Sequence, residues 1–248
     1  MSLVEVRELT KVYHTGEVEV AALRGLDFDI EEGEFVAVMG RSGSGKTTLL
    51  NVLGCVEQPT AGRYLLAGEE VARLNDAQRS NLRLRRLGFV FQSYNLLPSL
   101  SAVDNVLLPT VYSGIANAQV RAREMLARVG LDGRGHHRPA QLSGGEQQRV
   151  AIARSLINSP SIILADEPTG NLDTRSGQDV LSLFQELHRD GITIVLVTHE
   201  EQVAEHAQRI VRLMDGRLES DRRVERPLDA RAVLAQMLVQ SERSEGPS

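Results

Sequence analysis

The sequence of 248 residues has no Trp, only five Phe and four Tyr, and a single Cys. So few aromatic rings leave little material for the stacking platforms on which proteins bind single-stranded nucleic acid. Cys55 cannot form a disulfide within the chain, and we expect it to pack as a small apolar residue. Neither single-strand binding nor disulfide stabilisation is therefore indicated.

Long apolar runs and an excess of basic residues are also absent. No window approaches the roughly 18 apolar residues of a membrane-spanning helix, and residues 1–5 lack the basic and apolar parts of a secretory signal. The 28 basic and 33 acidic residues give a net charge of −5, which argues against general nucleic-acid binding. We expect a cytosolic globular protein without a nucleic-acid partner, in which any membrane role comes through another chain.

Residues 40–47, with the sequence GRSGSGKT, match the phosphate-loop pattern G-x-x-x-x-G-K-[ST]. The apolar run 35–39 predicts a buried parallel strand before the loop, and residues 47–54 begin a predicted helix after it. Glycines in such a turn let backbone N–H groups approach a phosphate at the start of a helix. Lys46 is then placed to reach the β- and γ-phosphates, and the Thr47 hydroxyl to bind Mg²⁺.

Three further apolar runs predict parallel strands with polar residues at their carboxyl ends, where open α/β sheets bind ligands. Residues 87–91 lead to Gln92, residues 161–165 to Asp166 and Glu167, and residues 192–197 to Thr198 and His199. The acidic pair fits a carboxylate that positions Mg²⁺, Asp166, followed by a candidate general base, Glu167. The alternative, plain surface charge, is disfavoured because a buried strand precedes the two acids.

Residues 142–146, with the sequence LSGGE, start a predicted helix that continues to Ile157. Ser143 and Glu146 have the S-x-x-E spacing of a capping box, and the two glycines between them leave N–H groups open to an anion. The sequence therefore predicts a second phosphate-binding helix terminus.

The remaining segments fill out the organisation of the chain. Alternating residues 3–9 and 26–30 predict an antiparallel layer, with Tyr13 in the loop between them as either an adenine platform or ordinary packing. Residues 93–142 predict a helical insert with helices over 103–109 and 117–129. We also predict a strand over 62–68, a helix over 77–87, a helix over 178–188 and a hairpin over 210–219. On the helix over 77–87 we expect a solvated face of Arg79, Arg83, Arg85 and Arg86, and we expect His136 and His137 to be exposed. Near the C-terminus, one helical face could be formed by Leu228, Val233, Leu234, Met237 and Leu238, and the last eight residues are predicted to be disordered.

Taken together, these motifs resemble the ATP-binding cassette (ABC) family over residues 1–220. The resemblance implies an α/β fold, with a P-loop NTPase core on a parallel sheet, an antiparallel β layer and a helical insert at about 93–142. Residues 221–248 would then form a C-terminal helix and tail. Asp104-Asn105-Val106, followed by Pro109, resembles the macrolide-export and lipoprotein-releasing subfamily.

The resemblance also implies a role for each site residue. ATP and Mg²⁺ would be the cofactors, and two copies of the chain would enclose two nucleotides. Catalysis would involve Glu167 as general base, His199 at the γ-phosphate, Gln92 and Lys46; Thr47, Gln92 and Asp166 would serve Mg²⁺; and the nucleotide would be bound by Tyr13, Gly40, Ser42, Gly43, Ser44, Gly45, Lys46, Thr47 and Thr48, with Ser143, Gly144, Gly145 and Asp173 acting across the dimer.

The same resemblance implies a separate transmembrane permease, which would hold the chain at the inner face of the membrane and convert ATP hydrolysis into transport. Three other functions stay open: a soluble ABC ATPase, a regulator of cell-wall hydrolases through a permease-like partner, and an importer ATPase. The first is disfavoured because the chain has neither a long coiled-coil insertion nor a second cassette. The transported substance cannot be inferred from this sequence.

Overall fold

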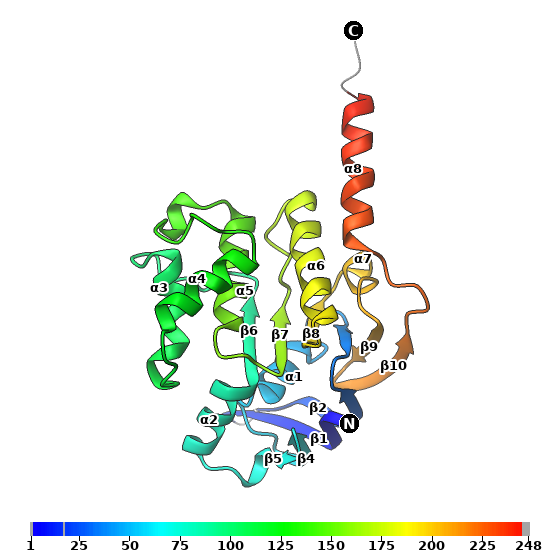
Figure 1. Cartoon of the computed structure of the whole chain (residues 1–248). Coiled ribbons are helices and arrows are strands. Elements are labelled where there is room, and N and C mark those ends of the chain that lie inside the picture. Colours follow the sequence, from blue (N-terminus) through cyan, green and yellow to red (C-terminus); the bar gives the residue numbers. More distant parts are fainter. Residues whose placement is uncertain (1, 17, 245–248) are drawn as a thin grey trace.

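A computed structural model describes residues 2–16 and 18–244 of the chain (Figure 1). Its central sheet has six strands in the order β10-β9-β3-β8-β7-β6. The five strands from β9 to β6 run parallel, and β10 pairs antiparallel with β9 at the edge. These strands span Phe35–Met39 (β3), Leu87–Phe91 (β6), Ile162–Asp166 (β7), Thr193–Thr198 (β8), Arg209–Met214 (β9) and Arg217–Arg223 (β10).

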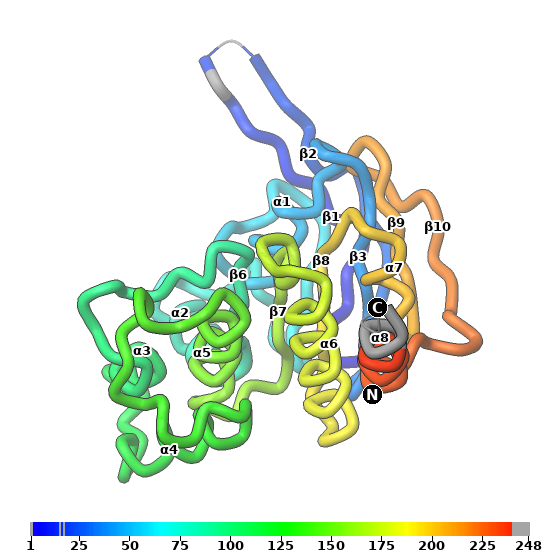
Figure 2. Tube along the Cα trace, turned by 90° about the horizontal axis from the view of Figure 1, so that it is seen from above, coloured from blue at the N-terminus to red at the C-terminus, as the bar shows by residue number. Residues whose placement is uncertain are grey.

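A second, antiparallel sheet has the order β2-β1-β4-β5. Its first two strands form a long hairpin whose outer end projects from the body of the molecule (Figure 2). The strands span Ser2–Thr15 (β1), Val18–Glu31 (β2), Ala61–Leu66 (β4) and Glu69–Glu70 (β5). This sheet is the antiparallel layer that the sequence predicted.

Helices surround the central sheet. The helix after the phosphate loop, α1, lies between the two sheets, and α5 and α6 pack on the opposite face of the central sheet. The helix α8 begins against α6, where Ala230 is buried, and then extends away from the body (Figure 1). The α-helices span Lys46–Leu53 (α1), Asp76–Arg86 (α2), Ala102–Leu107 (α3), Ala118–Arg128 (α4), Gly144–Leu156 (α5), Thr174–Arg189 (α6), Glu201–Ala204 (α7) and Ala230–Ser244 (α8), and the 3₁₀ turns span Val71–Arg73 (η1), Leu108–Tyr112 (η2) and Pro139–Gln141 (η3). Within the described residues, no helix is long and apolar enough to cross a bilayer.

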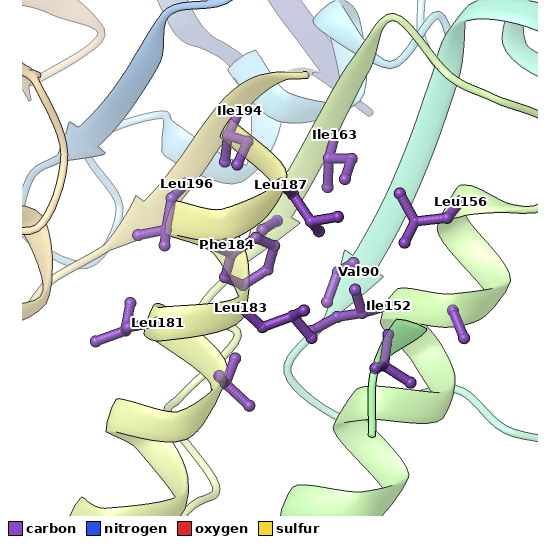
Figure 3. Close-up of a cluster of buried hydrophobic side chains, with 14 of the residues drawn as sticks. Val90, Ile152, Leu156, Ile163, Leu181, Leu183, Phe184, Leu187, Ile194 and Leu196 are labelled. Carbon is purple, nitrogen blue, oxygen red and sulfur yellow. The ribbon is translucent and has the colours of Figure 1, made fainter. Parts of the chain in front are cut away.

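The inner strands are apolar throughout because both of their faces are covered. In β8, Ile194 and Leu196 join the core under α5 and α6, while Val195 and Val197 join the core under α1 and the antiparallel sheet. Figure 3 shows the first core, where Phe184 of α6 lies among side chains from α5, β7 and β8. This packing fixes the carboxyl ends of the parallel strands at one edge.

The structure confirms the predicted α/β fold, and it corrects several local predictions. Tyr13 is not in a loop, because β1 continues to Thr15; a bulge at Glu8, whose φ is +47°, interrupts the alternation on which the prediction depended. The last eight residues are not all disordered, because α8 includes residues 241–244, and residues 245–248 lie outside the described part.

The arginines of α2 were predicted to form a solvated face, and two of them do not. Arg79 donates to the carbonyl of Leu74 at 2.8 Å, and Arg83 donates to the carbonyl of Cys55 at 2.6 Å. Both side chains therefore tie α2 to neighbouring loops, because a guanidinium has enough donors to satisfy several carbonyls. Arg85 and Arg86 are exposed as predicted.

Asn105 explains part of the subfamily motif in structural terms. Its side chain is fully buried in α3; the amide oxygen accepts from the backbone N–H of Leu97 at 2.7 Å, and the amide nitrogen donates to the carbonyls of Leu97, Leu100 and Ser101. One side chain thus holds the loop that leads from the Gln92 segment into α3.

We predict that Asn105→Ala lowers the free energy of unfolding by about 1–3 kcal/mol, because buried backbone groups lose their partner. Chemical denaturation of the purified chain measures this loss. Asn81→Ala, at an exposed position of α2, is the matched control and should change stability by no more than about 0.5 kcal/mol. Equal stability of the Asn105 variant and the parent would show that the loop does not depend on this amide.

Candidate functional site

The parallel strands end at a hollow that opens above the phosphate loop. One cavity of about 600 Å³ lies between this loop, β2 and the β9–β10 turn, and an adjoining cavity of about 910 Å³ lies over the loop toward β9. Both cavities share Ser42, Gly43, Glu167, His199 and Asp215. The first is lined by Val20, Ala21, Ala22, Arg24, Ser42, Gly43, Gly45, Lys46, Thr47, Thr48, Glu167, His199, Asp215 and Gly216.

Glycines give the phosphate loop its shape for two different reasons. A Cβ on Gly40 would lie 2.4 Å from the carbonyl oxygen of Leu213, and a Cβ on Gly45 would lie 2.6 Å from that of Ala22, so neighbouring backbone excludes side chains there. Gly43 has open space around it but a φ of +78°, a conformation that favours glycine. The loop therefore presents bare backbone to the cavity, as an anion site requires.

Lys46 is held inside this loop. Its ammonium donates to the carbonyls of Gly40 at 2.8 Å and Arg41 at 2.9 Å, and the residue is 8% exposed. Burial, reinforced by the neighbouring charge of Glu167, raises the pKa of Asp166, whereas the nearby Lys46 cation lowers it. A cation and a carboxylate are thus held near each other at the start of α1 and the end of β7, although Asp166 lines neither cavity.

Glu167 and His199 face each other across the ends of β7 and β8. The backbone of Glu167 is left-handed, with φ of +44°, and its N–H donates to the carbonyl of Val197 at 2.9 Å. His199 Nδ1 lies 2.9 Å from Glu167 Oε1. Strained backbone of this kind is common at functional sites. The structure brings the predicted base and the predicted γ-phosphate contact into direct contact.

Gln92 lies beside this pair of strands, but it does not line either cavity. Its amide nitrogen donates to Asn171 Oδ1 at 3.4 Å, and Asn171 Nδ2 returns a bond to the Gln92 carbonyl at 3.1 Å. The next residues, Tyr94 and Asn95, have left-handed backbone, and Arg154 of α5 donates to both of their carbonyls. The Gln92 segment is therefore fastened to α5.

The predicted Mg²⁺ ligands form an incomplete set by themselves. Within residues 2–16 and 18–244, no group of three or more His, Cys, Asp or Glu side chains could hold a metal ion. Thr47 at the start of α1 and Asp166 at the end of β7 do offer a hydroxyl and a carboxylate. Mg²⁺ is typically bound by one or two protein oxygens together with phosphates and water, so this donor set fits it.

The second predicted anion site is well formed but lies elsewhere. Ser143 caps α5 through a reciprocal capping box with Glu146, and neither Ser143, Gly144 nor Gly145 lines the two cavities. Asp173 caps α6, accepting from the N–H of Ser176 at 3.0 Å and from its hydroxyl, and these bonds lower its pKa. Both caps therefore lie outside the two cavities of the single chain.

Tyr13 also lies outside the cavity lining. It pairs across the hairpin with Val20, which does line the first cavity, and its hydroxyl donates to Glu57 at 2.6 Å. Tyr13 therefore lies beside Val20, next to the residues that line the first cavity.

The sequence did not predict the contribution of β2 and of the β9–β10 turn. The N–H of Gly216 donates to the carbonyl of Ser44, and the N–H of Arg24 donates to the carbonyl of Gly216. The Asp215-Gly216 pair was recognised as a hairpin turn, but its contact with the phosphate loop depends on tertiary structure. No local signal in the sequence could have found it.

Comparison with known proteins identifies the class. Residues 23–170 match the family described as ABC transporter. The chain therefore belongs to this family, whose ATP-binding chains are ATPases.

Individual relatives agree with this assignment. An uncharacterized ABC transporter ATP-binding protein of Thermotoga maritima is 54% identical over 219 residues, which are 88% of this chain and 94% of the relative. The macrolide export ATP-binding/permease protein MacB of Syntrophobacter fumaroxidans is 51% identical over 89% of this chain. The chain spans only 32% of that MacB protein, so the two correspond over about a third of its length.

A solved structure is also similar. The ATP-binding cassette MJ0796, in a dimeric post-hydrolysis state bound to ADP and Pi, matches with a TM-score of 0.82 and 42% identity. The match covers 90% of this chain and 99% of the MJ0796 chain. The fold and the class of protein are thereby established.

We predict that Lys46→Ala weakens ATP binding to the single chain by about 10- to 100-fold, because charge-assisted bonds to the phosphates are lost. Ser143→Ala should leave this binding within about twofold, since Ser143 lies outside the cavity. Calorimetry on monomeric protein measures both affinities.

Ser101→Ala is the matched control for Ser143→Ala, because the Ser101 side chain also caps a helix, α3, by accepting from the N–H of the third residue. It should cost similar helix stability and leave ATPase activity unchanged, whereas Ser143→Ala should reduce activity. An equal loss of monomer affinity in the Lys46 and Ser143 variants would contradict a site divided between two chains.

Proposed function

We propose that this chain is the ATP-hydrolysing subunit of an ABC transporter of the macrolide-export or lipoprotein-release type. Two copies would close around two ATP molecules and drive a separate permease. The observation that carries the proposal is the division of the site: the phosphate loop, Glu167 and His199 share one hollow, while the capped α5 terminus at Ser143 lies outside it.

A dimer explains this division. The N–H groups at the start of α5 and the Asp173 cap of α6 would meet the phosphate loop of the partner, with the γ-phosphate between them. The similar MJ0796 cassette is dimeric, which supports this arrangement. Without nucleotide, two polar surfaces would face each other with no charge to satisfy them. We therefore expect the chain to be mainly monomeric until ATP is bound.

Each residue near the γ-phosphate then has a role. Lys46 would exchange the loop carbonyls of Gly40 and Arg41 for phosphate oxygens. Glu167 would accept a proton from water as the water oxygen bonds to the γ-phosphorus and the bond from that phosphorus to the β–γ bridging oxygen breaks. His199, held 2.9 Å from Glu167, would bind the γ-phosphate. Mg²⁺, when bound beside Thr47, Asp166 and Gln92, would neutralise charge that develops on the phosphate oxygens.

A groove on the other side of Gln92 supports the permease partner. Its volume is about 390 Å³, and it is lined by the stacked rings of Phe89 and Phe91 and by Arg83 and Arg154, with no carboxylate. Pro109, which lines the groove, belongs to the 3₁₀ turn η2, and in the same turn Val111 and Tyr112 are 69% and 87% exposed. Exposed apolar residues of this kind mark interaction surfaces.

This groove would hold a cytoplasmic segment of the permease, and through it the chain would lie on the inner face of the membrane. Residues 1–220 would form the cassette, residues 93–142 its permease-facing helical part, and residues 221–248 a C-terminal segment. MacB relatives that combine ATP-binding and permease parts support such a partner. The transported substance stays open.

We predict that Glu167→Gln lowers the ATP hydrolysis rate by about 10²- to 10⁴-fold, because the amide cannot accept the proton of the attacking water. ATP binding should survive, and size-exclusion chromatography with ATP and Mg²⁺ should show a persistent dimer. The parent chain should form only a transient one.

Arg86→Ala, at an exposed site of α2 outside both cavities, is the control and should hydrolyse ATP like the parent. Hydrolysis at the parental rate by the Glu167 variant would show that another group is the base.

We predict that Val111→Asp weakens co-purification of the permease from solubilised membranes at least about fivefold, because a charge is placed in an apolar contact. ATP binding should not change. Val120→Asp, at an exposed apolar position of α4, tests how far the contact extends. A four-span partner with a large extracytoplasmic domain would support the proposal, and a soluble partner captured equally by both variants would defeat it.

A further inference from the structure

Tyr13 is held by a polar cluster that none of the roles above uses. The cluster joins β1 to the end of α1 and the loop after it. Tyr13 donates its hydroxyl to Glu57 Oε2 at 2.6 Å, Asn51 of α1 donates to Glu57 Oε1 at 3.0 Å, and Lys11 Nζ lies 3.1 Å from Glu57 Oε2. Both oxygens of the Glu57 carboxylate are thus engaged.

The cluster is ordered by partial burial as well as by contacts. The Lys11 and Glu57 side chains are 16% and 25% exposed, and Lys11 also donates to the carbonyl of Gln58 at 2.9 Å. Burial opposes ionisation of Glu57, but bonds from Tyr13, Lys11 and Asn51 together hold its pKa below its ordinary value. The carboxylate therefore stays charged, and it is a strong acceptor for the Tyr13 hydroxyl.

The contacts restrict the orientation of the Tyr13 ring and place a cation over one of its faces. The Lys11 ammonium lies over the ring at 5.0 Å from its centroid, a cation–π contact that covers one face. Across the hairpin, Val20 pairs with Tyr13 and lines the nucleotide cavity. Thr48, which also lines the cavity, is close enough to lower the pKa of Tyr13, although burial and Glu57 raise it overall.

We propose that Glu57 is a positioning residue that fixes the Tyr13 ring, so that the face opposite Lys11 is presented to the base of the bound nucleotide. Glu57 thereby sets how much the base, as distinct from the phosphates, contributes to affinity. The inference rests on the proposed ATP site and on Tyr13 as its base platform. Because Asn51 belongs to the helix that starts at the phosphate loop, base and phosphate recognition share one rigid element.

The test compares two ligands that share a phosphate chain, Mg-ATP and Mg-tripolyphosphate, the second of which has no base. Glu57→Ala should weaken ATP binding about tenfold, the scale of one lost base–aromatic stack, and leave tripolyphosphate binding unchanged. Glu57→Gln keeps an acceptor for the Tyr13 hydroxyl and should recover part of the loss. A role in folding alone would affect both ligands equally.

A double-mutant cycle separates positioning from independent effects. In the Tyr13→Ala background, Glu57→Ala should cause no further loss of ATP affinity. Glu124→Ala, an exposed glutamate of α4 outside the cavity, controls for loss of charge, and thermal unfolding of each variant confirms that it is folded.

Several outcomes overturn the inference. Additive losses in the cycle, or equal losses for the two ligands, would reduce Glu57 to a structural ion pair. Unchanged ATP affinity in Tyr13→Ala, with tripolyphosphate still bound, would remove the platform on which Glu57 acts. If the parent chain bound neither ligand, the proposed function itself would fail, and this result is distinct from the others.

Discussion

The whole site depends on a close approach of three backbone segments that leaves no room for side chains. A Cβ on Gly45 or on Gly216 would lie 2.6 Å from the carbonyl oxygen of Ala22, and one on Gly40 would lie 2.4 Å from that of Leu213. The phosphate loop is therefore wedged between β2 and the β9–β10 hairpin. This wedging, rather than the loop sequence alone, makes the loop rigid enough to present its N–H groups without a ligand.

Features that depend only on short contiguous segments could be predicted from the sequence. The strand, loop and helix around Lys46, the capping box at Ser143 and the acids at the end of β7 each follow from neighbouring residues, and their order gives the fold. Features that depend on strand register or on tertiary contacts could not be predicted from the sequence. Tyr13 continues in β1 because the pairing with β2 persists through several register shifts, one of them around Glu8. Arg79 donates to the carbonyl of Leu74, a contact that no local pattern predicts. The contacts that Gly216 and Glu57 make near the site likewise depend on tertiary structure.

Division of the site between two copies of the chain would let ATP binding stabilise the closed dimer. A ligand shifts an equilibrium only by its differential contacts with the two states. The γ-phosphate would make contacts in a closed dimer that the open chain cannot make, because Ser143 and the phosphate loop of one molecule do not meet. Hydrolysis would remove those contacts. Glu167 and His199, already in contact in the single chain, would not have to be assembled by closure.

The bonds from Arg154 to Tyr94 and Asn95 have a mechanical meaning. They join the helix that begins at Ser143 to the segment that begins at Gln92, so a rotation of α5 carries this segment with it. In the proposed dimer, those two ends would serve different nucleotides. The Arg154 guanidinium would then make the start of α5 and the Gln92 segment move as one unit, so that each copy could transmit the state of one nucleotide to the other through its own interior.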